Sequence, residues 1–161
     1  MLRCFHILLL FAVFGHISAA TALIKAVDGD SLTDGETRIR LDGIDAPEIF
    51  QTCRNNKGEE YACGQEAYLY LQRLTADHDV HCSCLPQKDK YNRDLCECFV
   101  GDLSLNQKMV EAGWALPYRT EKYAAQQNSA TVQKRGLWQG KFMRPALFRA
   151  LERLLQKEYK H

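Results

Sequence analysis

The chain has 161 residues, of which 46% are apolar and 25% are charged, and its formal net charge is +1. This composition is typical of one globular domain and excludes a disordered or collagen-like chain. A nearly neutral protein attracts polyanions only weakly at long range, so any nucleic-acid role would depend on a local basic patch.

Residues 1–20 differ from the rest of the chain. They combine an early cation, Arg3, with an apolar run over 7–15 and small residues at 18–20. This is the pattern of a secretory signal peptide, cleaved after Ala20. A membrane anchor is the alternative, but spanning a bilayer takes about 20 apolar residues, and His16 interrupts this run. We therefore predict export to the periplasm or the medium, with no membrane attachment after cleavage.

Charge is unevenly spread along the predicted mature chain. Residues 21–133 hold 12 basic and 18 acidic side chains, whereas residues 134–161 hold 8 basic and 2 acidic ones. The C-terminal segment could supply a basic patch, although an amphipathic surface helix would have the same composition.

Alternating apolar residues predict a first strand over 22–28, followed by a hairpin that bends near Asp34 and Gly35. In the second arm of this hairpin, Arg38 and Arg40 share one face, opposite the apolar residues between and after them. Residues 45–63 are loop-like. Two further strands are predicted over 79–85 and 95–100, and helices over 64–76, 103–113, 120–136 and 144–160.

These elements predict an α+β domain, a five-stranded OB-type β-barrel with about three packed helices. We expect the signal peptide at 1–20, the barrel domain over 21–141, and a basic amphipathic helix over 142–161 that packs on the domain or trails it. We expect a monomer.

The predicted mature chain holds an even number of cysteines, which indicates disulfides in an exported protein. They are Cys53, Cys63, Cys82, Cys84, Cys96 and Cys98. If the strands over 80–85 and 94–100 are antiparallel neighbours, one register places Cys82 opposite Cys98 and Cys84 opposite Cys96. Diagonal pairing or a single bridge stays open, and the remaining two cysteines pair by elimination. A zinc site is the rival interpretation, but the C-x-C spacing does not suit it.

Four acidic residues follow predicted strands that can meet at one end of the sheet. Asp28 and Asp30 lie at the end of the first strand, and Asp45 and Glu48 follow the third. Carboxylates, a backbone carbonyl and water make an all-oxygen site that suits Ca²⁺ and does not suit zinc. Taken alone, an Asp-Gly pair such as Asp28-Gly29 indicates an ordinary turn rather than a ligand.

Two arginines accompany these acids, Arg40 just before the acidic loop and Arg93 in "KDKYNRD". A guanidinium can hold a phosphate through two hydrogen bonds and stabilise the charge that develops during cleavage. Metal-holding acids, a spare carboxylate and two arginines together would suit phosphodiester hydrolysis. Surface ion pairing is the alternative.

The segments "AVDGDSL", "IRLDGIDAPE" and "DKYNR", in this order, resemble the staphylococcal-nuclease-like (thermonuclease) family, specifically its exported bacterial branch. The resemblance continues through "GQEA", "LNQKMVEAGWA", "KRGLWQGKF" and "RPALFRA", and it covers about residues 22–150. It implies an OB-fold and a Ca²⁺-dependent nuclease that hydrolyses DNA and RNA with little sequence preference, leaving 3′-phosphates. The cysteines at 53, 63, 82 and 98 also resemble those of this branch.

The resemblance also implies a role for each matched residue. Asp30 and Asp45 correspond to the calcium carboxylates, Ala46 to the ligand that binds through its backbone carbonyl, and Glu48 to the general base. The matched phosphate-binding and substrate residues are Arg40, Arg93, Lys90 and Tyr91, with Asp28 as a supporting acid. Tyr118 corresponds to the base-stacking tyrosine, although "WALPYRT" departs from the family pattern around it.

Two other functions remain open at this point. The barrel could bind single-stranded nucleic acid without cutting it, as OB-folds often do. It could also be a disulfide-stabilised scaffold for protein contacts. The complete pattern of acids and arginines favours the nuclease.

Overall fold

The central sheet has six strands, five of them in the order β1-β2-β3-β8-β7 and the sixth, β9, paired to β8. The computed structural model describes residues 23–159. Strands β1 to β3 are antiparallel neighbours, β3 pairs with β8 in parallel, and β7 pairs with β8 in antiparallel. The strands are β1 (Lys25–Ala26), β2 (Ser31–Thr33), β3 (Arg38–Leu41), β7 (Val80–Lys88), β8 (Asp94–Val100) and β9 (Leu103–Ser104).

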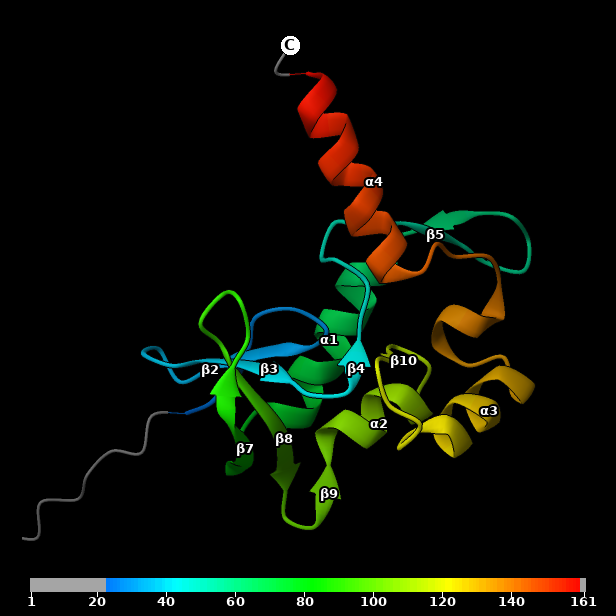
Figure 1. Cartoon of the computed structure of the whole chain (residues 1–161). Helices are drawn as coiled ribbons and strands as arrows, with labels where there is room; N and C mark the ends of the chain where they lie inside the picture. The colour runs from blue at the N-terminus through cyan, green and yellow to red at the C-terminus, as the bar shows by residue number, and fades with distance from the viewer. Residues whose placement is uncertain (1–22, 160–161) are drawn as a thin grey trace, which may run out of the picture.

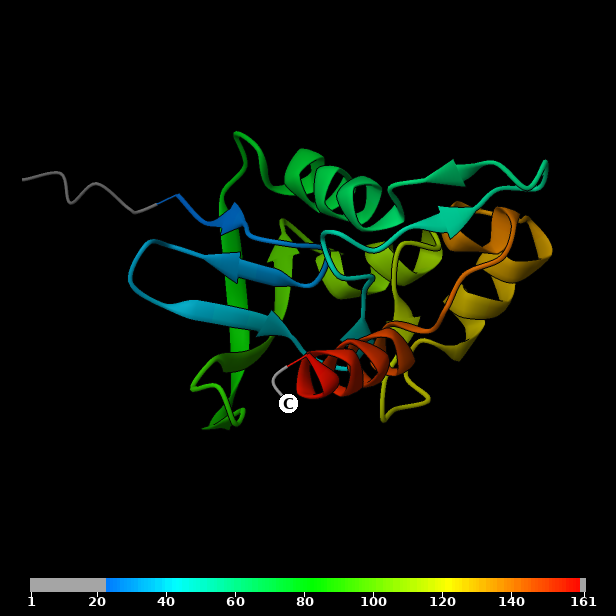
Figure 2. The same cartoon turned by 90° about the horizontal axis from the view of Figure 1, so that it is seen from above.

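This sheet is strongly curled, because β7 and β8 cross β2 and β3 at a steep angle (Figure 2). Two short strand pairs extend it. They are β4 (Ile44–Asp45) with β10 (Leu116–Pro117), and β5 (Cys53–Arg54) with β6 (Glu60–Tyr61). The predicted α+β fold of OB type is confirmed, with more and shorter strands than the sequence pattern suggested.

Four α-helices and one short 3₁₀ helix accompany the sheet. They are α1 (Cys63–Thr75), α2 (Leu105–Glu111), α3 (Ala124–Val132), η1 (Gly136–Gln139) and α4 (Pro145–Glu158). Helix α4 extends away from the body of the protein at its C-terminal end (Figure 1). Pro145 occupies its first turn, where a missing backbone N–H costs nothing.

Two helices are shorter than predicted. The helix predicted over 103–113 begins only at Leu105, because the two preceding residues pair with β8. Ser104 caps this helix, since its hydroxyl accepts a hydrogen bond from the backbone N–H of Gln107. The helix predicted over 120–136 ends at Val132, and Lys134 has φ = 53°, which is incompatible with a continuing helix.

The core lies between the sheet and helices α1 and α2. Leu41 from β3, Leu71 from α1 and Met109 from α2 are all fully buried. Ile39 and Leu41 face this core, whereas Arg38 is exposed, so the predicted faces of β3 are confirmed. Arg38 and Arg40 therefore lie on the face of β3 that points away from this core.

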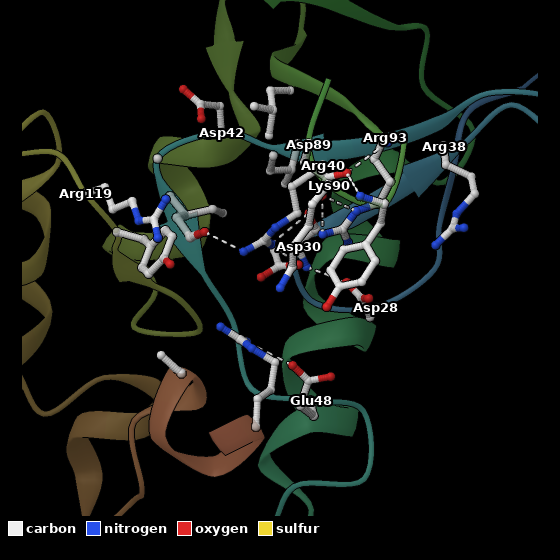
Figure 3. A pocket seen from close by; sticks show the side chains of 18 of the residues that line it. Asp28, Asp30, Arg38, Arg40, Asp42, Glu48, Asp89, Lys90, Arg93 and Arg119 are labelled. Carbon is white, nitrogen blue, oxygen red and sulfur yellow. Dashed lines mark hydrogen bonds and ion pairs between the residues drawn. The ribbon is translucent and has the colours of Figure 1, made fainter. Parts of the chain in front are cut away.

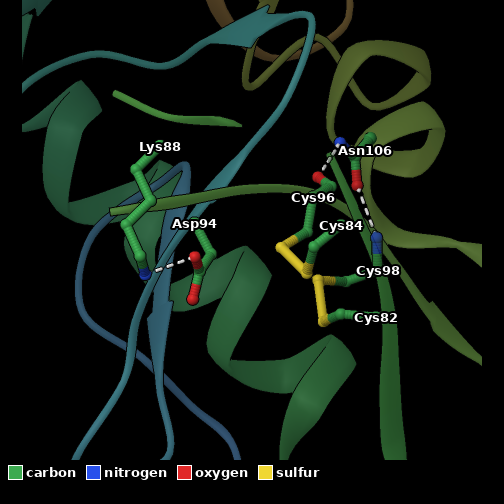
Figure 4. Close-up of a disulfide and its surroundings, with 7 residues drawn as sticks. All are labelled: Cys82, Cys84, Lys88, Asp94, Cys96, Cys98 and Asn106. Atoms are coloured by element: carbon green, nitrogen blue, oxygen red, sulfur yellow. Dashed lines mark hydrogen bonds and ion pairs between the residues drawn. A yellow bond between two sulfur atoms is a disulfide. The ribbon is translucent and has the colours of Figure 1, made fainter. Parts of the chain in front are cut away.

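The disulfides follow the predicted strand register. Cys82 lies opposite Cys98 and Cys84 lies opposite Cys96, and each opposed pair is bonded (Figure 4). The third bridge joins the remaining two cysteines, at positions 53 and 63. The diagonal, single-bridge and zinc alternatives are therefore wrong.

Asn106 joins the bridged strand to the acidic segment that follows β3. Its buried side chain accepts a hydrogen bond from the backbone N–H of Cys98 and donates to the carbonyls of Cys96 and Asp42. A buried amide with its partners satisfied adds rigidity at this point.

Within residues 23–159, every helix is too short or too polar to cross a membrane. The predicted signal peptide lies outside the described residues. The proposed domain boundaries remain predictions.

Candidate nuclease active site

A cleft of about 890 Å³ lies beside the arginine face of β3. Four separate parts of the chain line it: the strand ends and loops around β2 to β4, the β7–β8 loop, residues 118–120 after β10, and one side of α4 (Figure 3). Its charged and aromatic lining residues are Asp28, Asp30, Arg38, Arg40, Asp42, Glu48, Asp89, Lys90, Tyr91, Arg93, Tyr118, Arg119, Arg149 and Arg153.

Gly29 allows the turn after β1 to approach the acidic loop. A Cβ atom at this position would lie 2.7 Å from the Cβ of Ala46 and 2.9 Å from that of Ala67, so a side chain would force these segments apart. The close approach lets Asp30 Oδ2 accept a hydrogen bond of 2.8 Å from the backbone N–H of Ala46. Asp28 Oδ1 in turn accepts from the backbone N–H of Asp30, at 2.9 Å.

Arg40 joins the two predicted metal carboxylates. Its guanidinium forms an ion pair with Asp30, and its Nη2 lies 3.3 Å from Asp45 Oδ1. The same Nη2 donates to the carbonyl of Ile44 at 3.0 Å. Burial by itself lowers the pKa of Arg40, but the charge and hydrogen bond of Asp30, together with the charges of Asp45 and Asp28, outweigh this effect, so the pKa is raised. Arg40 therefore stays charged and holds both carboxylates at the end of β3.

The acidic side of the site holds more negative charge than Arg40 balances. Burial, together with the charge of Asp30, raises the pKa of Asp28 to about 6. Burial also raises the pKa of Asp45, although nearby arginines partly offset it. Asp30 and Asp45 are only 7% and 3% exposed. A buried cluster of this kind is stabilised by an added cation.

The donors present fit a hard cation. Within residues 23–159, no group of three or more His, Cys, Asp or Glu side chains is arranged to bind a metal ion. The carboxylates of Asp30 and Asp45 nevertheless lie together, since both contact Arg40, and they offer oxygen donors only. The backbone of Ala46 adjoins them, because its N–H donates to Asp30. Calcium readily completes such a partial set with water.

Glu48 follows a buried proline on the acidic loop. The loop is closed by a hydrogen bond of 2.7 Å from the backbone N–H of Gln51 to the carbonyl of Glu48. Gly64, at the start of α1, packs against the same carbonyl, so closely that a Cβ there would lie 1.7 Å from its oxygen. The carboxylate is 32% exposed, so solvent can reach it.

Arg93 lies on the other wall of the cleft and is held by Asp89. Its Nε donates to Asp89 Oδ2 at 2.8 Å, and its Nη1 donates to the hydroxyl of Ser31 at 3.2 Å. Burial acts to raise the pKa of Asp89, but the hydrogen bonds from Arg93 and from nearby backbone outweigh it, so the pKa is lowered. Sequence reasoning missed Asp89, although it lies in the segment that supplied Arg93.

Aromatic side chains extend this wall toward solvent. Tyr91 is 56% exposed, and the ammonium of Lys90 lies 4.8 Å from the centre of its ring. Tyr118 lines the same cleft, because β10 pairs with β4 and the backbone N–H of Tyr118 donates to the carbonyl of Gly43. Apart from the disulfide cysteines, the residues proposed from the sequence therefore lie at one site. They either line this cleft or contact a residue that lines it, as Asp45 and Ala46 do.

Sequence reasoning also missed Arg149, which reaches the acidic loop from α4. Its Nη2 lies 2.9 Å from Asp45 Oδ1, and its Nη1 lies 2.9 Å from Glu48 Oε1. The segment "RPALFRA" had been noted for its resemblance, but nothing in it indicated a contact with these two carboxylates.

A family model described as "Staphylococcal nuclease homologue" matches residues 38–140. The chain belongs to the staphylococcal nuclease family. The family assignment identifies this part of the chain as a nuclease domain, a hydrolase. The matched residues include Arg40, Asp45, Glu48 and Arg93, whereas Arg149 lies beyond them.

The chain is also similar to curated proteins, several of which are named as nucleases. The chain is 31% identical to the succinoglycan biosynthesis protein ExoI of Rhizobium meliloti over 71% of its own length, and spans 62% of that protein. It is 34% identical to an uncharacterized endonuclease of Escherichia coli O157:H7, covering 72% of this chain and 74% of the relative. It is also 26% identical to the thermonuclease of Staphylococcus hyicus, over 72% of this chain and 73% of the relative.

Proposed function

We propose that the protein is an exported, Ca²⁺-dependent nuclease that hydrolyses DNA and RNA with little sequence preference and leaves 3′-phosphates. The observation that carries this proposal is the meeting of Asp30, Asp45 and Arg40 at one end of β3, in a cleft that Glu48 and Arg93 also line. Family membership supports the reaction class, and three disulfides support an oxidising destination.

In this proposal, Asp30, Asp45 and the carbonyl of Ala46 would hold the cation. Bound Ca²⁺ would supply positive charge opposite the charge that develops on the phosphate. Asp28 supports the arrangement, since its carboxylate fixes the backbone of Asp30.

The remaining residues act on water and on the substrate. Glu48 accepts a proton from the water that attacks phosphorus. The bond from phosphorus to the 5′ oxygen breaks, the leaving oxygen takes a proton from solvent to become a 5′-hydroxyl, and a 3′-phosphate remains. Arg40 and Arg93 donate hydrogen bonds to phosphate oxygens and stabilise the five-coordinate transition state. Lys90, Tyr91 and Tyr118 bind the flanking nucleotides. Exposed aromatic rings beside cations suit stacking with bases of any sequence.

Cleavage of supercoiled plasmid by the purified protein with intact disulfides tests this proposal. We expect nicking and degradation in millimolar Ca²⁺ and none in excess chelator. Glu48→Gln should lower the rate by about 10²–10⁴-fold, the usual contribution of a general base. Glu36→Gln, which removes an exposed carboxylate at the bend between β2 and β3, should retain full activity.

Other outcomes would change the assignment. Full activity of Glu48→Gln would remove Glu48 from the mechanism. A folded protein that shifts single-stranded DNA without cutting it would be a binding module of the OB type. If the folded protein neither cleaves nor binds nucleic acid, only the scaffold role would remain.

A further inference from the structure

Helix α4 is held to the barrel mainly through its first two turns. Pro145 is buried, and Phe148 packs on Phe50 with ring centres 5.6 Å apart. Beyond these contacts the helix is exposed, with Leu151 at 40% and Leu154 at 60% exposure. Within residues 23–159, Arg149 makes every ion pair that joins α4 to the rest of the protein.

Arg149 contacts two carboxylates that have separate tasks in the proposed reaction. One nitrogen pairs with Asp45, a proposed cation ligand, and the other pairs with Glu48, the proposed base, each at 2.9 Å. Asp45 Oδ1 is also within 3.3 Å of Arg40. Two guanidinium groups thus contact Oδ1 of Asp45, one of the two oxygens that this carboxylate could offer to a cation.

A cation bound at Asp45 Oδ1 would compete with Arg149 for this oxygen. Calcium binds carboxylate oxygens at about 2.3–2.6 Å, which would place it next to a guanidinium that already contacts the same oxygen. Like charges at this separation repel strongly where water is partly excluded. Arg149 also occupies one carboxylate oxygen of Glu48, the proposed base, as long as this contact lasts.

We propose that Arg149 takes the place of the cation in the metal-free protein and leaves Asp45 and Glu48 when a divalent cation binds. This inference rests on the proposed function, which makes these residues a cation ligand and the base. Binding and release are then coupled in both directions: Arg149 lowers the affinity for the cation, and the cation weakens the attachment of α4.

Arg153 provides a matched control for this coupling. It lies one turn further along α4 and lines the same cleft, yet among the described residues it forms no ion pair within 4.0 Å, unlike Arg149. Arg149→Met and Arg153→Met therefore remove the same charge from the same helix, but only the first removes the contact with the carboxylates.

Calorimetric titration with Ca²⁺, in the absence of nucleic acid, measures the effect. We expect Arg149→Met to bind Ca²⁺ about tenfold more tightly than the native protein, the effect of losing one competing charged hydrogen bond. Arg153→Met should stay within about threefold of native affinity, the smaller effect of a distant charge. Arg149→Lys, which keeps the charge but cannot form the two-armed contact, should fall between them.

Hydrogen exchange of the α4 amides gives a second readout. Addition of Ca²⁺ should speed exchange in the native protein and have no such effect in Arg149→Met. Two results would overturn the inference and leave the proposed function intact. One is that the native protein binds Ca²⁺ but the Arg149→Met and Arg153→Met variants bind it with equal affinity. The other is that Ca²⁺ does not change the exchange rate of the α4 amides in the native protein. Absence of Ca²⁺ binding to the native protein would overturn both.

Discussion

Replacing Arg40 with methionine removes a buried cation from between two buried carboxylates. The side chains of Arg40, Asp30 and Asp45 are only 12%, 10% and 4% exposed. Loss of one partner from a buried ion pair typically costs about 3–5 kcal/mol, because the other charge is left uncompensated. Asp45 keeps its contact with Arg149, so only Asp30 loses its cation. We therefore expect the free energy of unfolding to fall by about 3 kcal/mol, the lower end of this range.

Urea unfolding in excess chelator at neutral pH, followed by tryptophan fluorescence, would measure this loss. Arg38→Met is the matched control, because Arg38 is two residues earlier on the same strand, is exposed, and lines the same cleft. An exposed substitution of this kind should change stability by no more than about 0.5 kcal/mol. Saturating Ca²⁺ should reduce the deficit of Arg40→Met, since a bound cation would compensate Asp30. Equal unfolding midpoints and slopes for the two variants would refute the assignment of Arg40 as the charge that stabilises these carboxylates.

Two further predictions concern the parts that position the site. Gly64→Ala would place a methyl group against the carbonyl of Glu48. We expect the free energy of unfolding in urea to fall by about 2–3 kcal/mol and cleavage to be reduced. Unchanged stability would contradict this packing. Replacing Cys84 and Cys96 together with serine should cost only about 1 kcal/mol, because the neighbouring bridge already closes nearly the same loop in the unfolded chain. Urea unfolding of this double variant under oxidising conditions checks the estimate, and a loss of 3 kcal/mol or more would show that the two bridges act independently.

Local patterns were enough to predict most of the elements. The alternation in β3 separated its core face from its arginine face, and the C-x-C spacing in β7 and β8 predicted the register of two disulfides. Both patterns succeed because residues two apart on a strand always share a face. Helix ends were predicted less well, because strand pairing determined where α2 begins and a backbone conformation with positive φ follows the end of α3.

The candidate site was predicted in part by residue type and in part by resemblance. Asp30, Asp45 and Arg40 lie near the ends of strands that an antiparallel hairpin brings together, so their meeting could be foreseen. The support for Arg93 by Asp89 could have been found as well, since the two residues are four positions apart in one loop. Calcium binding and the individual roles remain predictions.

What the sequence determined by itself is therefore the set of chemical groups and their local order: acids after strands, arginines on one face, cysteines in register. Only the tertiary structure decided that Arg149 reaches Glu48, 101 positions earlier in the chain. No periodicity relates residues at that separation. Their contact depends on where the packing of Pro145 and Phe148 directs the start of α4. The side chain that most directly opposes cation binding in our proposal could be recognised only after the chain was folded.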